Sequence, residues 1–167
     1  MKTVDYIKMS LETSGTMITG LLDDMRDAPL TQPTSNGGNH PLWILGHLTF
    51  SESNIIHTFV LGEQNPLESW AELFAGGGTE PVPDASIYPD WDEIRSKWDE
   101  VMENTLRVLE SLSDDDLDKP SKNCPPEREA FFGTVGQCFA ILTLHRVMHF
   151  GQVADARRVA GRKPLFV

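Results

Sequence analysis

Two histidines one helical turn apart, His145 and His149, lie on the apolar stripe of the last long helix that the sequence predicts. Residues four apart are separated by about 40° around an α-helix, so both imidazoles can reach one metal ion. A third histidine, His47, lies on the buried-looking face of another predicted helix. Three neutral imidazoles can hold a divalent transition metal and leave positions open for water or substrate. The alternative from the residues alone is three core histidines kept neutral by hydrogen bonds.

Two common kinds of zinc site do not fit this pattern. The zincin motif places Glu directly after its first histidine, whereas Arg146 follows His145, and we expect Arg146 to point away from the helix seam. A structural zinc site closes with four protein ligands, but Cys138 is two turns, or about 10 Å, from His145 along the axis. The pattern therefore favours an open site with Lewis-acid or nucleophile-activating chemistry. No catalytic residue can be assigned beside it.

Four residues near the histidines are candidates for lining a pocket or for bonding to a metal ligand: Trp43, Ser51, Leu142 and Gln152. Trp43 and Ser51 lie one turn before and one turn after His47. Gln152 follows His149 by three residues and could bond to its ring. Each also has a structural interpretation, which is core packing for Trp43, close helix contact for Ser51 and a backbone hydrogen bond for Gln152.

Three further polar residues are expected to stay outside the site. His40 precedes Pro41 at a helix start, so we expect it to cap the helix or to be exposed. His57 is rotated off the stripe that carries His47 and is expected at the periphery. Glu52 is also rotated off that stripe, and we expect it to face solvent.

Apolar residues at spacings of three and four predict four long helices. Their expected ranges are 3–26, 41–61, 90–112 and 134–160. Capping boxes are expected where Asp90 is followed by Glu93 and where Thr134 is followed by Gln137. Short helices are expected over 66–74 and 113–117, and a loop over the proline-containing segment 119–133.

The predicted elements define an all-α fold, because no segment shows the alternation of a strand. Four helices of similar length predict a four-helix bundle. The connection between the second and third helices is long enough to cross the whole bundle, so those two can run parallel. The short link between the first two favours antiparallel neighbours.

Composition limits the classes of function. The chain has 167 residues, of which 40% are hydrophobic and 23% charged, so we expect 1–167 to form one globular domain. No apolar run could span a membrane and no signal peptide is evident, which predicts a cytoplasmic protein without a membrane partner. The net charge of −11 argues against binding nucleic acid. Two cysteines make no disulfide framework.

Three segments carry a family resemblance. They are H-P-L-W-I-L-G-H-L-T-F-S-E from His40, H-R-V-M-H-F-G-Q-V from His145, and R-R-V-A-G-R-K-P-L-F near the end. In this order they resemble the DinB/YfiT-like superfamily of metal-binding four-helix proteins. The resemblance implies an up-down-down-up bundle, a homodimer, and a divalent metal, often zinc or nickel, held by His47, His145 and His149.

Members of this superfamily with known activity are thiol-dependent, and they include bacillithiol and mycothiol transferases and a mycothiol-dependent maleylpyruvate isomerase. The resemblance therefore implies an S-transferase whose metal activates a low-molecular-weight thiol or water against a small-molecule substrate. The sequence shows no basic cluster for the carboxylates of a sugar-linked thiol, so the thiol stays unassigned. The alternative is a non-catalytic, metal-stabilised helical module that binds a partner or small ligand.

Overall fold

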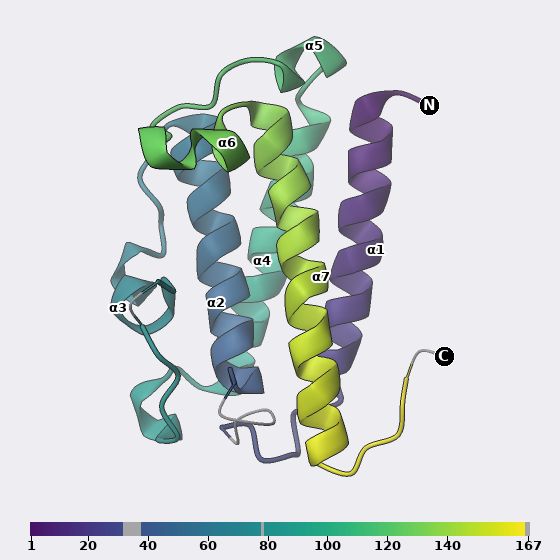
Figure 1. The fold of residues 1–167 in the computed structure, drawn as a ribbon, viewed down its shortest axis with the longest axis vertical. Helices are drawn as coiled ribbons and strands as arrows, with labels where there is room; N and C mark the ends of the chain where they lie inside the picture. Colours follow the sequence, from purple (N-terminus) through teal and green to yellow (C-terminus); the bar gives the residue numbers. More distant parts are fainter. Residues whose placement is uncertain (32–37, 78, 166–167) are drawn as a thin grey trace.

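The computed structural model of the chain describes residues 1–31, 38–77 and 79–165. The described residues form helices and no strand, so the predicted all-α class is confirmed. The four longest helices lie lengthwise beside one another (Figure 1). They are α1 (Thr3–Asp23), α2 (Pro41–Asn54), α4 (Trp91–Glu110) and α7 (Val135–Val159). No helix in these three ranges is long and apolar enough to cross a membrane.

The helix after α2 departs from ordinary α-helical geometry. The predicted helix 41–61 is α-helical only to Asn54, and its last seven residues form the π-helix η1 (Ile55–Leu61). Gly62 ends it in the left-handed region, with φ 74°. A π-helix widens the turn and is frequent at functional sites. Here η1 begins directly after the turn of α2 that carries Ser51.

The long connection from η1 to α4 runs down the outside of the bundle, beside α2 (Figure 1). It contains η2 (Glu68–Trp70), α3 (Ala71–Phe74) and η3 (Ala85–Ile87). In Figure 1, α1 and α7 descend, whereas α2 and α4 ascend. In the place of the predicted short helix 66–74, the structure has the 3₁₀-helix η2, which begins at Glu68, followed directly by α3.

Helix caps explain where the elements begin. His40 caps α2, because its Nδ1 accepts a hydrogen bond from the Trp43 backbone N–H at 3.1 Å. Thr134 and Gln137 form the predicted capping box of α7. Asp90 precedes α4, but its side chain makes no cap hydrogen bond, so the capping box predicted with Glu93 is wrong.

The predicted loop 119–133 also contains helix. It holds η4 (Pro126–Arg128) and α6 (Glu129–Phe132), in addition to the short α5 (Asp114–Leu117) before it. The prolines did not exclude helix here, because Pro126 occupies the first position of a helical turn, where its missing N–H costs nothing. α6 lies across the upper ends of α2 and α7 (Figure 1).

Glu52 and Arg146 are buried in the centre of the bundle, so both expectations of outward-pointing side chains are wrong. Each side chain is 2% exposed, and Arg146 Nε donates to Glu52 at 2.9 Å. The guanidinium also donates to the Leu11 carbonyl on α1 and stacks over Trp98 on α4. Gly15 leaves room for it, since a Cβ there would lie 3.0 Å from Arg146 Nη1. One arginine thus touches all four long helices.

The burial of Arg146 shows that the buried face of α7 differs from the apolar stripe that the sequence predicts. The most buried residues of α7 include Leu142, Arg146 and Val153, whereas His145 and Gln152 are only half-buried. Adjacent positions of an α-helix are about 100° apart, so His145 lies at the edge toward α2 while Arg146 faces the core. His145 therefore lies at the border of the core, whereas His149 is buried.

Candidate metal centre

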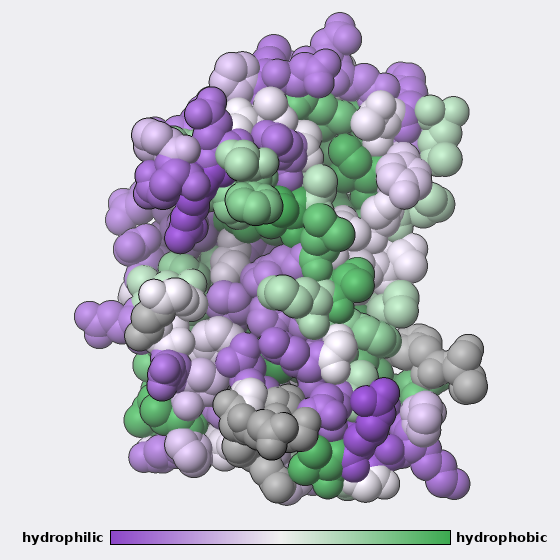
Figure 2. Space-filling view, in the orientation of Figure 1, coloured by the Kyte–Doolittle hydropathy of each residue, from purple (hydrophilic) through white to green (hydrophobic). Residues whose placement is uncertain are grey.

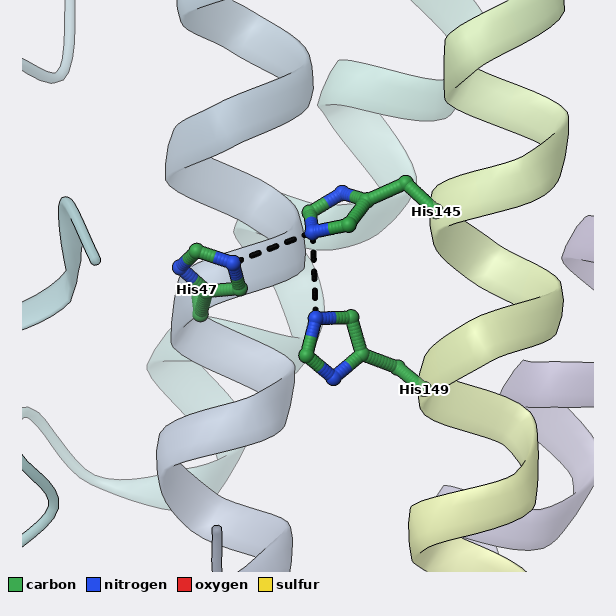
Figure 3. A group of neighbouring side chains, drawn as sticks. All are labelled: His47, His145 and His149. Carbon is green, nitrogen blue, oxygen red and sulfur yellow. Dashed lines mark hydrogen bonds between the residues drawn. The ribbon is translucent and has the colours of Figure 1, made fainter. Parts of the chain in front are cut away.

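Two helices bring the three histidines together, with His47 from α2 and His145 and His149 from α7 (Figure 3). The Nε2 atom of His145 lies 3.0 Å from Nε2 of His47 and 3.0 Å from Nε2 of His149. One ligand atom from each residue lies within 4.8 Å of the other two. The convergence expected from sequence spacing is therefore present as geometry.

The outer ring nitrogens of two histidines are fixed by acceptors. His47 Nδ1 lies 2.7 Å from the Phe74 carbonyl, which can only accept, so this nitrogen carries the proton. His149 Nδ1 lies 2.8 Å from Gln152 Oε1 and must likewise donate. Asn39 donates to the same amide oxygen at 3.2 Å and so orients it. In neutral rings these bonds leave both Nε2 atoms with a free lone pair.

Burial keeps all three rings neutral. It lowers the pKa of His47, and it lowers the pKa of His149 to about 4. The pKa of His145 falls to about 3, first through burial and then through the neighbouring His149, His47 and Arg146. A histidine must be neutral to ligate a metal, so the environment selects the metal-binding form near pH 7.

The three Nε2 atoms are arranged better for binding one divalent transition metal than for hydrogen bonding to one another. Lone pairs of His47 and His149 both point at the single Nε2 of His145, which can supply at most one proton. At least one of the two close contacts therefore has no hydrogen between its nitrogens. A cation held among them would satisfy all three lone pairs at once, and imidazole suits zinc, nickel, copper and iron.

The segment after α3 encloses His47. Phe74 packs on Gly46, where a Cβ would lie 2.2 Å from the Phe74 ring, and its carbonyl then meets the His47 ring. Gly76 has φ 73°, and a Cβ on it would lie 2.9 Å from His47 Cε1. Both glycines are thus required by close approach. Apolar periodicity does not predict the path of this segment, and the run of glycines from Gly76 is its one visible signal in the sequence.

Three of the four residues predicted around the histidines lie beside them. Trp43 stacks on His47 with ring centroids 4.5 Å apart, and its indole N–H donates to the Leu73 carbonyl. Gln152 bonds His149, and the Ser51 hydroxyl lies 3.5 Å from His47 Nδ1. Leu142 is fully buried in the apolar core instead.

A pocket of about 200 Å³ opens beside His47 and His145. Its walls are mostly apolar, and its polar lining includes Ser51, Asn54 and Arg128. The apolar lining residues come from α2, η1, α6, α7 and the end of α3: Phe50, Ile55, Phe59, Phe132, Ile141 and Ala75. The widened turns of η1 therefore form part of the wall. Sequence reasoning did not single out Arg128.

The other histidines and the cysteines lie outside the centre. His57 contacts Asn104 and Glu63 across a different pocket, as its expected peripheral position suggests. Cys138 is a buried core residue, and burial raises its thiol pKa to about 12. Cys124 is half-buried in a loop.

A comparison with protein families places these elements in a known group. Residues 10–153 match the model of the DinB superfamily. The matched span includes all three histidines and their hydrogen-bonding partners Phe74 and Gln152. No curated protein matches the chain.

Proposed function

The chain belongs to the DinB superfamily, and from the geometry of its histidine cluster we propose that it is a metal-dependent enzyme, specifically a thiol-dependent S-transferase. The observation that carries the proposal is the convergence of the three Nε2 atoms, together with the acceptors that hold the outer ring nitrogens of His47 and His149. His47, His145 and His149 would hold the metal, with zinc or nickel as the expected ions.

Bound there, a divalent metal would supply Lewis-acid chemistry and lower the pKa of a thiol or water. The chain's own residues support this role in two ways. Phe74 and Gln152 fix the ring orientations, and such partners tune both the affinity and the position of a ligand. The apolar pocket walls would replace part of the hydration shell of a molecule bound beside His47 and His145.

Within the described part of the chain, no carboxylate that could act as a general base lines the pocket. Glu52, next to Ser51 in the chain, is committed to Arg146 in the core. The proposal therefore assigns no proton-transfer role to an acidic side chain. A low-molecular-weight thiol would act as cosubstrate, and a small electrophilic molecule would occupy the pocket.

We also propose a helix topology and an oligomeric state for the protein. We assign residues 1–167 to one domain with an up-down-down-up four-helix bundle, which the opposed directions of α1 and α7 against α2 and α4 support. Figure 2 shows hydrophobic residues gathered on the face where α7 lies. Leu144, Val147 and Met148 of α7 are each more than half exposed, and we propose that this face forms a homodimer. Sedimentation of wild type and Leu144→Asp tests the dimer.

Metal analysis of protein purified without a His-tag tests the function at its first step. We expect one equivalent of metal in the wild type and in His57→Ala, whose histidine lies outside the cluster. We expect a large loss in His149→Ala. Equal, substoichiometric metal in wild type and His149→Ala would contradict the proposal.

Turnover of thiol and electrophile pairs then separates an enzyme from a binding module. Metal-loaded protein should accelerate transfer for at least one pair in a panel of low-molecular-weight thiols, and His149→Ala should not. A stoichiometric metal with no rate above that of the metal-free protein would favour the non-catalytic module instead.

A further inference from the structure

Arg128 is set apart from the other arginines by its lack of a partner. Within the parts of the chain that the structure describes, every other arginine makes an ion pair with Asp or Glu. The Arg128 side chain has neither an ion pair nor a hydrogen bond there, although Glu127 and Glu129 flank it in the sequence. Its guanidinium is therefore available to bind a ligand.

The position of Arg128 indicates which pocket its free guanidinium could serve. It lies on η4, directly before α6, and it lines the same pocket as His47 and His145. The Phe132 ring of α6 packs against Phe59 with centroids 5.2 Å apart, which connects this segment to η1. The lining of the pocket thus combines His47 of α2 and His145 of α7 with Arg128 of η4.

The charge of the lining is opposite to that of the molecule. The chain carries a net charge of −11, yet among the residues that the structure describes no Asp or Glu lines this pocket, and Arg128 is the only charged residue that does. A concave site lined by one sign of charge concentrates ions of the other sign. An anion is therefore the ligand that the pocket favours against the general repulsion of the surface.

The remaining lining restricts the kind of anion. Six apolar side chains line the space, and its volume of about 200 Å³ suits a small molecule. The amide oxygen of Asn54 is occupied by the Thr58 hydroxyl at 3.0 Å, so its NH₂ group is the one left to donate. A single guanidinium pairs a carboxylate in a bidentate manner, whereas a doubly charged phosphate ester would keep an unpaired charge among apolar walls.

We propose that Arg128 binds the carboxylate of a small monoanionic substrate whose apolar body fills the pocket beside His47 and His145. The assignment of this ligand as a substrate rests on the proposed function, but the binding itself does not require a metal. The acceptor of the transfer is then an aryl or alkyl carboxylic acid with its electrophilic carbon at the end nearer the histidines. The thiolate sulfur would form a bond to that carbon, and the leaving group would depart with the electron pair of the bond that breaks.

Calorimetric binding of matched probes tests the proposal. The probes are phenylacetate, 3-phenylpropionate and hexanoate, each with its neutral amide, together with phenyl phosphate. The proteins are wild type, Arg128→Gln, Arg128→Lys and the control Arg107→Gln, whose arginine makes only an exposed ion pair with Glu103. Because Arg128 is exposed, its substitution should leave the fold unchanged, which circular dichroism checks.

We expect wild type and Arg107→Gln to bind at least one carboxylate about tenfold more tightly than its amide, or about 1.4 kcal/mol. Arg128→Gln should lose this preference, and Arg128→Lys should retain part of it. The preference should persist after metal removal, which distinguishes it from a failure of the metal proposal. Equal binding of acids and amides, no binding of any probe, or tighter binding of phenyl phosphate would overturn the assignment. So would a preference that survives Arg128→Gln but disappears with the metal, since the carboxylate would then sit at the histidines.

Discussion

The hydrogen bonds of the outer ring nitrogens of His47 and His149 leave the Nε2 atoms of these two rings free to bind a metal. Spacing along the helices is enough to predict that His145 and His149 share a face and that His47 can meet them. It also indicates Gln152 as a partner, because that residue lies on the same helix. Phe74 could not be found in this way, since its carbonyl reaches His47 through a loop whose path no periodicity describes. Arg128 was missed for the same reason.

His40 allows a test of hydrogen bonding at a single residue. Its Nδ1 caps α2 and its Nε2 donates to the Val82 carbonyl, so the folded protein needs the neutral ring. Burial lowers its pKa below the ordinary 6.5. The unfolded state therefore binds more protons as the pH falls through 6.5, and stability is lost in that direction.

We expect His40→Asn to reduce this loss, because asparagine is a good cap and does not titrate. Between pH 7 and pH 5 the free energy of unfolding of the wild type should fall more steeply, by at most about 1.4 kcal/mol per pH unit. Urea unfolding of metal-free protein at several pH values measures the two slopes. Identical slopes would show that His40 does not contribute.

At the scale of elements, the predicted helices are largely present, and the errors concern their faces. In α4, charged residues mark the solvent side. The apolar residues at spacings of three and four are buried from Trp91 to Val101, and Leu109, rather than Val108, continues that face. In α7, apolar residues occur all round the helix, and Leu144 and Val147 are exposed. The pattern therefore could not show that Arg146 faces inward. Its partner Glu52 was misplaced for a related reason, since charge alone suggested solvent.

The buried ion pair predicts a strong asymmetry between single and double substitutions. Glu52→Gln should cost about 3–5 kcal/mol of unfolding free energy, because it leaves the Arg146 charge buried and unpaired. Glu52→Met combined with Arg146→Met should recover much of that loss. The control Glu103→Gln removes an exposed pair and should cost about 1 kcal/mol or less. Denaturant titration would contradict this account if the double variant were the least stable.

At the scale of the whole molecule, the histidine cluster links the two halves of the chain, because α2 and α7 are separated by the long connection and by α4. A metal that binds only the folded state must stabilise it by mass action. His47 is about a hundred residues away from His145 and His149 in the sequence, and the packing of α2 against α7 brings the three histidines together.

Metal removal should therefore lower the stability of the folded chain. At a free metal concentration of 100 times the Kd, the gain in unfolding free energy is about 2.7 kcal/mol. Chelator should remove this gain in the wild type and in His57→Ala, and should leave His149→Ala unchanged. Melting curves with and without chelator measure the difference, and equal shifts in all three proteins would point to metal binding elsewhere.

The most direct test of the metal centre is anomalous diffraction from crystals grown with zinc or nickel and measured at the metal absorption edge. The account predicts one strong anomalous peak among His47, His145 and His149, about 2.0–2.1 Å from each Nε2 atom. The hydrogen bonds from His47 to Phe74 and from His149 to Gln152 should be retained. Crystals without a peak at this position, or with the metal bound only elsewhere on the chain, would contradict the central claim.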